Sequence, residues 1–193
     1  MTFKSSIASL ATRLAGYRFD IEEGWPKGSA VFIGAPHTSN WDFAAMLAIT
    51  WKAGIPVRWL GKSQAFDNPL GFVPRWLGGI PVNRDAPQGM AKALSEELAA
   101  TSGAVLILAP EGTRKKTDHW KSGFYRIARD AGLPIVPGFI DSTTKTMGLG
   151  PALVPSGNVV ADMDVLRAFY DVKKGFRPGL ESAVRISLEE EGA

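Results

Sequence analysis

Residues 30–42 read AVFIGAPHTSNWD, in which an apolar run gives way to a polar loop and then to a helical pattern. The run Ala30–Gly34 is short and apolar throughout, as in a strand that is buried on both faces of a parallel sheet. Ser39 followed three residues later by Asp42 has the form of a capping box, so we expect Ser39 to cap a helix that places Asp42 in its first turn. The segment therefore predicts a strand, a loop and a helix Ser39–Ala53 of an α/β fold.

Similar apolar runs alternate with helical patterns along the rest of the chain. Gly132 followed by Pro134 is the usual stop signal of a helix. The alternation predicts a single domain over residues 1–193, with a central, mostly parallel sheet flanked by helices. Residues 30–140 form its motif-bearing core and residues 141–193 a C-terminal extension. The expected strands are Val57–Leu60, Ile80–Val82, Val105–Ala109 and Ile135–Ile140, and the expected helices are Gly89–Thr101, Gly123–Ala131 and Val160–Lys173.

Residues 1–20 are expected to form an amphipathic helix rather than a signal peptide, because Lys4 and Arg13 interrupt the apolar character. Either the apolar stripe packs on the core or it lies on a membrane surface, and the sequence favours neither. No apolar run approaches the ~18 residues of a spanning helix, so a soluble or peripheral protein is expected. The apolar positions recur at steps of three and four residues: Phe3, Ile7, Leu10 and Leu14.

The composition excludes several kinds of chemistry. The 193 residues include no cysteine, so disulfides, zinc–thiolate sites and cysteine nucleophiles are absent, in keeping with a reducing cytoplasm. Lysine and arginine number 22 against 19 acidic residues, without a long basic run. This modest positive charge suits anionic lipids or phosphorylated substrates, and we expect no nucleic-acid partner.

His37 and Asp42 are the first candidates for chemistry, because they lie where a strand gives way to a helix. If His37 lies in the loop, Asp42 can turn back and accept a proton from one ring nitrogen, which leaves the other free as a base. Taken alone, an unrelated loop histidine beside a helix N-terminal aspartate is the more common arrangement. However, Arg84 and Arg114 each follow another expected strand, and strand ends on one edge of an open sheet are where ligands bind. Arginine there suits phosphate.

Four sequence blocks, in this order, resemble the glycerolipid acyltransferase family, whose best-known members acylate 1-acylglycerol-3-phosphate. The first two blocks are His37 with Asp42, and Gly79 with Arg84. The third block is Glu111-Gly112-Thr113-Arg114 and the fourth is Pro134-Ile135-Val136-Pro137. They cover roughly residues 30–140, and so many matches in the family's order are specific.

The resemblance implies an O-acyltransferase with a glycerol-3-phosphate acyltransferase-like fold. It would move a fatty acyl group from acyl-CoA or acyl-carrier protein to a lyso-lipid hydroxyl, most simply that of 1-acylglycerol-3-phosphate. His37 would be the general base, oriented by Asp42, and no cofactor or metal is implied. The acceptor would be bound by Arg84, Glu111, Gly112, Thr113 and Arg114. The expected location is cytoplasmic, peripheral on the inner face of the cell membrane.

Alternatives remain open on the sequence. The acceptor could instead be a lyso-ornithine lipid or a glycolipid, and a catalytically silent lipid-binding module would predict a damaged pair where His37 and Asp42 are intact. A metal-dependent hydrolase would use this pair as ligands, but the only other histidine is His119, which we expect in a loop. Six aromatic residues could line an acyl groove or an interfacial surface, although core packing is the more common role: Trp41, Trp51, Trp59, Phe66, Phe72 and Trp76.

Overall fold

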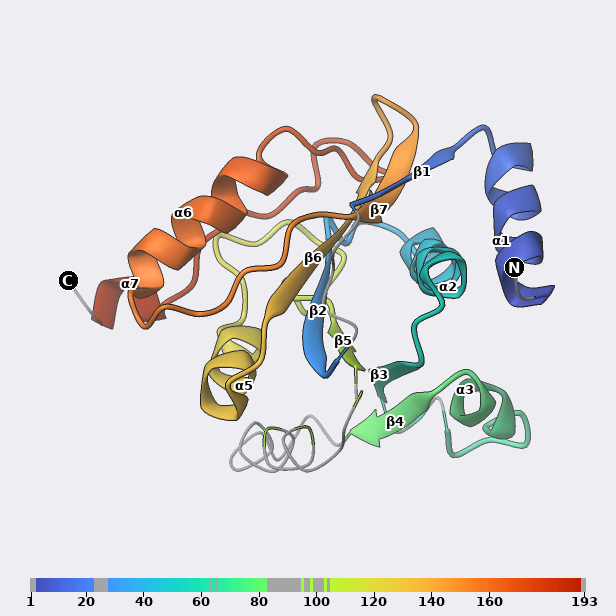
Figure 1. Cartoon of the computed structure of the whole chain (residues 1–193), viewed down its shortest axis with the longest axis horizontal. Coiled ribbons are helices and arrows are strands. Elements are labelled where there is room, and N and C mark those ends of the chain that lie inside the picture. Colours follow the sequence, from blue (N-terminus) through green and yellow to red (C-terminus); the bar gives the residue numbers. More distant parts are fainter. Residues whose placement is uncertain are drawn as a thin grey trace.

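The computed structural model of the chain describes residues 3–22, 28–62, 64, 66–82, 95, 98, 103 and 105–191. Within these residues, strands form one sheet in the order β1-β7-β6-β2-β5-β3-β4, and Figure 1 shows it in the middle of the molecule. All neighbours are parallel except β6 and β7. The mostly parallel α/β sheet is therefore as predicted. The strands are β1 (Arg18–Ile21), β2 (Ala30–Ala35), β3 (Val57–Lys62), β4 (Gly79–Val82), β5 (Val105–Leu108), β6 (Ile135–Asp141) and β7 (Thr146–Leu149).

Helices cover both faces of the sheet. Helices α1 and α2 lie on one side and α5 and α6 on the other (Figure 1). Helix α5 ends at Gly132 as predicted. The predicted helix Gly89–Thr101 lies almost entirely outside the described residues. The described helices are α1 (Phe3–Leu14), α2 (Trp41–Ala53), α3 (Phe72–Trp76), α5 (Gly123–Ala131), α6 (Val159–Tyr170) and α7 (Leu188–Glu191).

Both ends of the chain differ from the prediction. The N-terminal helix stops at Leu14 instead of continuing to Asp20, because the backbone turns at Gly16 (φ 76°) and Arg18–Ile21 then pairs with β7. Residues 141–193, expected as a C-terminal extension, form part of the core of the fold. They supply β7, and Met163 and Leu166 of α6 are buried in the core. Strands β1 and β7 have only four residues each, and neither is a continuous apolar run that would mark a buried strand.

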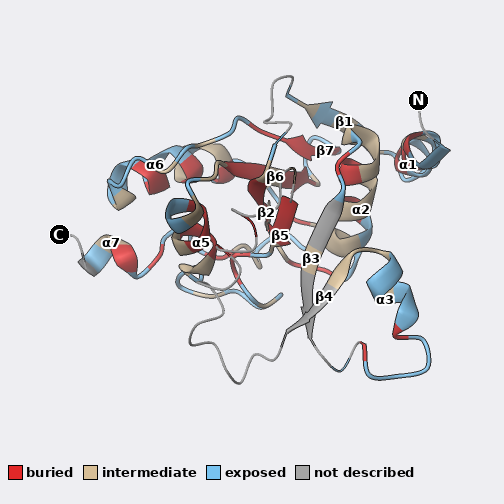
Figure 2. Cartoon of the chain, turned by 60° about the horizontal axis from the view of Figure 1, so that its bottom comes forward, coloured by how far each residue is buried: buried red, intermediate tan, exposed pale blue. Residues whose placement is uncertain are grey.

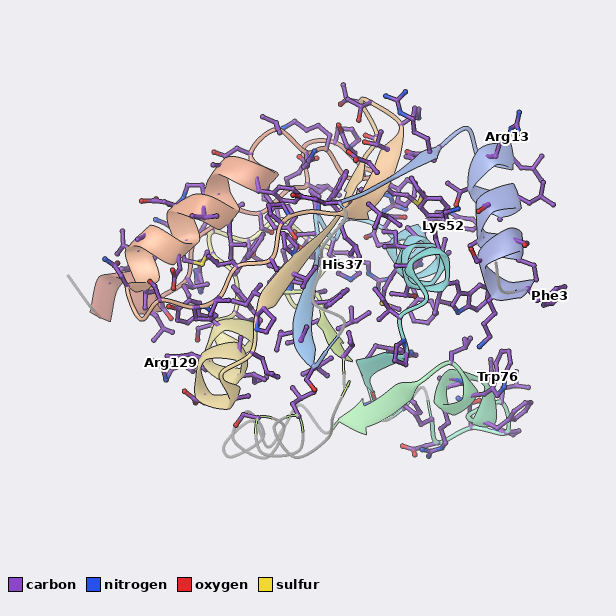
Figure 3. All side chains as sticks on the ribbon, in the orientation of Figure 1. Phe3, Arg13, His37, Lys52, Trp76 and Arg129 are labelled. Carbon is purple, nitrogen blue, oxygen red and sulfur yellow. The ribbon has the colours of Figure 1, made fainter. Side chains whose placement is uncertain are left out.

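The apolar stripe of α1 faces outward. Ser5, Ala8 and Thr12 are the buried residues of this helix, and the Nζ of Lys52 on α2 donates to the Oγ of Ser9 at 3.2 Å. The stripe itself is exposed, as Figure 2 shows in pale blue and as Figure 3 shows for Phe3. Packing of the stripe on the core, one of the two alternatives for this helix, is therefore wrong. The exposed fractions are 80% for Phe3, 41% for Ile7, 61% for Leu10 and 80% for Leu14.

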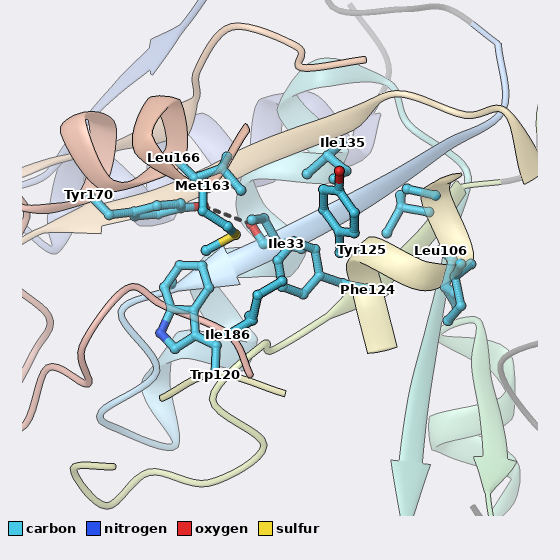
Figure 4. Packing of buried hydrophobic residues seen from close by; sticks show 14 of the residues in the cluster. Ile33, Leu106, Trp120, Phe124, Tyr125, Ile135, Met163, Leu166, Tyr170 and Ile186 are labelled. Atoms are coloured by element: carbon cyan, nitrogen blue, oxygen red, sulfur yellow. Dashed lines mark hydrogen bonds between the residues drawn. The ribbon is translucent and has the colours of Figure 1, made fainter. Parts of the chain in front are cut away.

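The central strand β2 is buried on both faces, as its unbroken apolar run predicts. Val31 and Ile33 belong to the cluster that α5 and α6 cover, shown in Figure 4. Ala30 and Phe32 belong to the cluster beneath α2. Side chains alternate between the faces of a strand, so one run of residues anchors both layers. This double anchoring fixes the carboxyl end of β2, where the loop with His37 begins.

Candidate active site

The crossovers of the sheet create a ligand-binding edge between β2 and β5. These strands are parallel neighbours, with Ile33 of β2 opposite Leu108 of β5. After β2 the chain passes through α2 on one face, and after β5 it passes through α5 on the other (Figure 1). Adjacent strands whose connections leave toward opposite faces open a crevice at their carboxyl ends, which is where open α/β sheets bind ligands. His37 follows β2 into this region, and Glu111 follows β5.

His37 and Asp42 form the contact that their spacing predicts. The Nδ1 of His37 lies 3.0 Å from the Oδ2 of Asp42, which occupies the first turn of α2. The same Oδ2 also accepts the backbone N–H of Ser39 at 2.7 Å, so the carboxylate is held in place. A carboxylate accepts only from a protonated nitrogen, so Nδ1 carries the hydrogen and Nε2 of the neutral ring is left with a free lone pair.

The start of α2 differs from the expected capping box in one respect. The cap position is occupied by Asn40, which has helical backbone angles and makes no side-chain cap hydrogen bond. Ser39 instead accepts the N–H of Trp41 at 3.3 Å. The returning half of the box is present, because Asp42 accepts the N–H of Ser39. Asp42 thus both caps the N-terminal end of α2 and holds the ring of His37.

Glu111 holds the backbone of the same loop from the neighbouring strand. Its Oε1 and Oε2 accept the backbone N–H of His37 at 3.0 and 2.8 Å, and the residue is only 2% exposed. Burial raises the pKa of Glu111 to about 7, against the lowering effect of the hydrogen bond from His37. The carboxylate predicted to contact the acceptor thus also fixes the position of the histidine backbone, a contact that the sequence did not reveal.

The residues after Glu111 turn toward the loop of His37. Gly112 has φ 66°, a left-handed conformation that a side chain would strain, and the N–H of Lys115 donates to the Oγ1 of Thr113 at 3.3 Å. The turn brings Thr113 and Arg114 to a pocket of about 440 Å³. Arg84, the other predicted arginine, lies outside the described residues. The pocket is lined by Thr38, Ser39, Asn40, Thr113, Arg114, Lys115, Lys116, Arg177 and Leu180.

Comparison with known proteins identifies the family. The sequence model of the Acyltransferase family matches residues 17–141, which include the pair His37 and Asp42 and the block that begins at Glu111. The chain belongs to this acyltransferase family.

Relatives of this acyltransferase share parts of its sequence and its fold. It is 29% identical over 119 residues to a chloroplastic 1-acyl-sn-glycerol-3-phosphate acyltransferase of Brassica napus. The match covers 59% of this chain and 33% of the relative, so the chain spans about a third of the relative's length. The crystal structure of the 1-acyl-sn-glycerophosphate (LPA) acyltransferase from Thermotoga maritima matches 86% of this chain and 77% of that one, with a TM-score of 0.60 and 18% identity. At this identity the structural likeness shows the fold.

Several pocket residues of the acyltransferase were not foreseen. Lys115 and Lys116 directly follow the third block, so the sequence could have indicated that they lie near the site, although it did not indicate that they line the pocket. Arg177 and Leu180 come from a Pro- and Gly-containing segment after α6 that has no motif and no periodicity. Only the folded chain brings them to the loop of His37.

Two other predictions concern histidine and the aromatic residues. His119 lies in a loop as predicted, and within the described part of the chain no group of three or more His, Asp or Glu residues could hold a metal ion. The preference for core packing is wrong for Trp41, Phe72 and Trp76, which are 70%, 66% and 72% exposed. Phe66 is buried as expected.

Proposed function

We propose that this acyltransferase moves a fatty acyl group from a thioester donor, acyl-CoA or acyl-carrier protein, to the hydroxyl of a lysophospholipid. The favoured acceptor is 1-acylglycerol-3-phosphate. The observation that carries the proposal is the 3.0 Å contact between Nδ1 of His37 and Oδ2 of Asp42, which lies near the carboxyl ends of the neighbouring strands β2 and β5. The family of the chain supports the reaction class.

In the proposed reaction, Nε2 of His37 takes the proton of the acceptor hydroxyl while that oxygen attacks the thioester carbonyl. The carbon–sulfur bond then breaks, and the leaving thiolate receives the proton. Asp42 keeps the ring in the correct tautomer and stabilises the imidazolium. A general base of this kind contributes about 10²- to 10⁴-fold, so positioning and oxyanion stabilisation must supply the rest. Because the N–H of Ser39 is engaged by Asp42, the amides of Thr38 and Asn40 are the candidate oxyanion donors.

The pocket beside the loop is proposed to hold the acceptor phosphate. Arg114 is the described member of the predicted pair of arginines, and Lys115 and Lys116 add positive charge to the same pocket. A guanidinium makes paired, charge-assisted hydrogen bonds to phosphate oxygens. Arg84 is proposed as a second contact on the strength of its place in the family's motif. An acceptor without phosphate would leave this concentration of positive charge without a partner.

We also infer that the protein binds a membrane surface through α1 and α3. The Nζ of Lys4 on α1 lies 5.5 Å from the ring of Trp76 on α3, and Figure 3 shows α1 and Trp76 on the same side of the molecule. Figure 3 places Phe3 of α1 on this side as well, and α1 and α3 also carry exposed Leu14 and Phe72. Apolar side chains with cations beside them suit an anionic lipid surface. No helix in the described ranges is long and apolar enough to cross a bilayer. The inner face of the cell membrane is the proposed location.

The experiment that tests the reaction uses the purified chain with a labelled acyl thioester and lysophosphatidic acid, and identifies the product by mass spectrometry. His37→Ala is expected to retain the fold and to lose nearly all acyl transfer. His119→Ala is the matched control, because it removes the other histidine from an exposed loop, and it should behave as wild type. A chelator should leave the rate unchanged. A His37 variant with wild-type turnover would show that the proposed chemistry is wrong.

A further inference from the structure

Residues 174–181 lie beyond the range that matches the family, yet they contact the catalytic loop directly. The backbone N–H of Arg177 donates to the Oγ1 of Thr38 at 3.1 Å. Thr38 is the residue immediately after His37 and is only 1% exposed. A segment far along the chain is therefore packed against the residue next to the proposed base.

This contact is tight and supported at both ends of the segment. A Cβ atom added to Gly175 would lie 2.5 Å from the Oγ1 of Thr38, so a glycine is needed for this approach. Glu181 accepts the N–H of Gly175 at 3.1 Å and the N–H of Gly179 at 2.7 Å. At the other end, the carbonyl of Lys174 accepts the N–H of Ser142 at 2.7 Å. These bonds give residues 174–181 a defined position against the loop.

The same segment brings a fourth cation to the pocket. Arg177 lines it together with Arg114, Lys115 and Lys116. Among the described residues, none of these four side chains forms a salt bridge with a carboxylate. Four cations that share a pocket without pairing to a carboxylate create a positive potential there, which favours binding of an anion of high charge density. A phosphate monoester is such an anion, and the guanidinium of Arg177 adds a planar donor for its oxygens.

We propose that residues 174–181 complete the acceptor site of this acyltransferase, with Arg177 binding the phosphate of the lyso-lipid together with Arg114. This inference rests on the proposed function and goes beyond it, because it assigns a phosphate-binding residue that lies outside the family's motifs. The phosphates of coenzyme A have the same chemistry. The acceptor is favoured because the segment is hydrogen-bonded to Thr38, and thereby fixes the phosphate relative to the base at His37, which must reach the acceptor hydroxyl.

The test compares Arg177→Ala with Arg129→Ala, which removes the same charge from an exposed position of α5 that does not line the pocket. The KM is measured for lysophosphatidic acid, for monoacylglycerol and for acyl-CoA. A lost charged hydrogen bond corresponds to about a 10- to 100-fold weaker interaction, so Arg177→Ala should raise the KM for lysophosphatidic acid by about that factor. It should leave use of monoacylglycerol and the KM for acyl-CoA unchanged, and Arg129→Ala should match wild type throughout.

Binding is measured separately by calorimetry with sn-glycerol 3-phosphate, and with glycerol as the control ligand. If the wild type transferred no acyl group, the proposed function would fail, while loss of sn-glycerol 3-phosphate binding in Arg177→Ala alone would still support a phosphate site. An unchanged KM for lysophosphatidic acid with unchanged phosphate binding would overturn the inference and leave the reaction in place. A raised KM for acyl-CoA alone would assign the pocket to the donor and would also overturn it.

The structural part of the inference is tested with Gly175→Ala. The added methyl group must displace Thr38 or the segment, so kcat should fall for both lysophosphatidic acid and monoacylglycerol. Gly123→Ala is the control, because a Cβ there meets no atom within 4 Å. Circular dichroism and the melting temperature verify that both variants fold. A folded Gly175→Ala enzyme with wild-type kcat would show that the segment does not position the loop.

Discussion

The buried carboxylate of Glu111 should make the stability of the protein fall as the pH rises. Both of its oxygens accept the N–H of His37, and the residue is 2% exposed. Desolvation by burial raises its pKa from 4.5 to about 7. Between these values the native state keeps a proton that the unfolded chain has already released. The contribution of Glu111 is therefore greatest below pH 4.5 and is lost as the pH rises through 7.

The size of this effect follows from the two pKa values. A tenfold change in proton affinity is worth about 1.4 kcal/mol, so a rise from 4.5 to about 7 corresponds to about 3 kcal/mol. Glu111→Gln removes the titration and keeps an amide oxygen that can accept the N–H of His37. The free energy of unfolding of the wild type minus that of the variant should thus fall by about 3 kcal/mol between pH 4 and pH 8.

Urea unfolding of both proteins at intervals from pH 4 to pH 8 measures this difference. Other titrating groups are common to the two proteins, so their contributions cancel. Glu190→Gln, at an exposed position of α7, controls for the loss of one carboxylate. A difference between wild type and Glu111→Gln that stays constant over this range would refute the reasoning, because Glu111 would then keep its ordinary proton affinity despite its burial.

Three further predictions concern the site and the surface. Asp42→Asn should lower kcat by about 10²- to 10⁴-fold with little change in acceptor KM, since it removes the charge that supports the imidazolium. An unchanged kcat would show that Asp42 takes no part in the reaction. Arg114→Ala should weaken use of lysophosphatidic acid but not of monoacylglycerol, and Arg114→Lys should restore only part of the loss, because a point charge cannot make the two-pronged contact; equal impairment on both acceptors would remove the phosphate assignment. Replacing exposed Leu10 and Leu14 by Glu should abolish sedimentation with anionic vesicles while the melting temperature stays within a few degrees of wild type; retained sedimentation would exclude α1 as the membrane contact.

The central part of the fold was predictable because its signals are local. The runs that became β2, β5 and β6 are apolar throughout, and such runs between helical patterns leave few choices other than buried parallel strands. The strands β1 and β7 were missed because β1 depends on pairing with β7, and β7 on pairing with both β1 and β6. Four-residue strands of mixed polarity carry too little local pattern to be recognised before their partners are known.

The candidate site divides in the same way. The contact of His37 with Asp42 joins residues five apart in one strand-loop-helix unit, and the sequence predicts it once the other blocks are considered with this pair. The hydrogen bonds from the N–H of His37 to Glu111 and from the N–H of Arg177 to Thr38 join residues 74 and 139 positions apart. No local pattern encodes them, because they depend on which strands become neighbours and on where a segment without periodicity comes to rest. For the apolar stripe of α1, the sequence likewise left open whether it packs on the core or lies on a membrane surface. The structure was needed to show that the stripe faces outward.

The two carboxylates around His37 also have a common electrostatic consequence. The charge of Asp42 raises the pKa of Glu111, whereas a positive charge on His37 lowers it. When the ring takes a proton from the acceptor hydroxyl, the new positive charge develops on a residue that Asp42 contacts at Nδ1 and that Glu111 contacts at the backbone N–H. Asp42, and Glu111 once it has released its proton, thus hold negative charge in advance at the residue where positive charge develops, which is the condition for electrostatic stabilisation of a transition state. Neutralising either carboxylate should weaken this electrostatic stabilisation without changing the position of the other carboxylate.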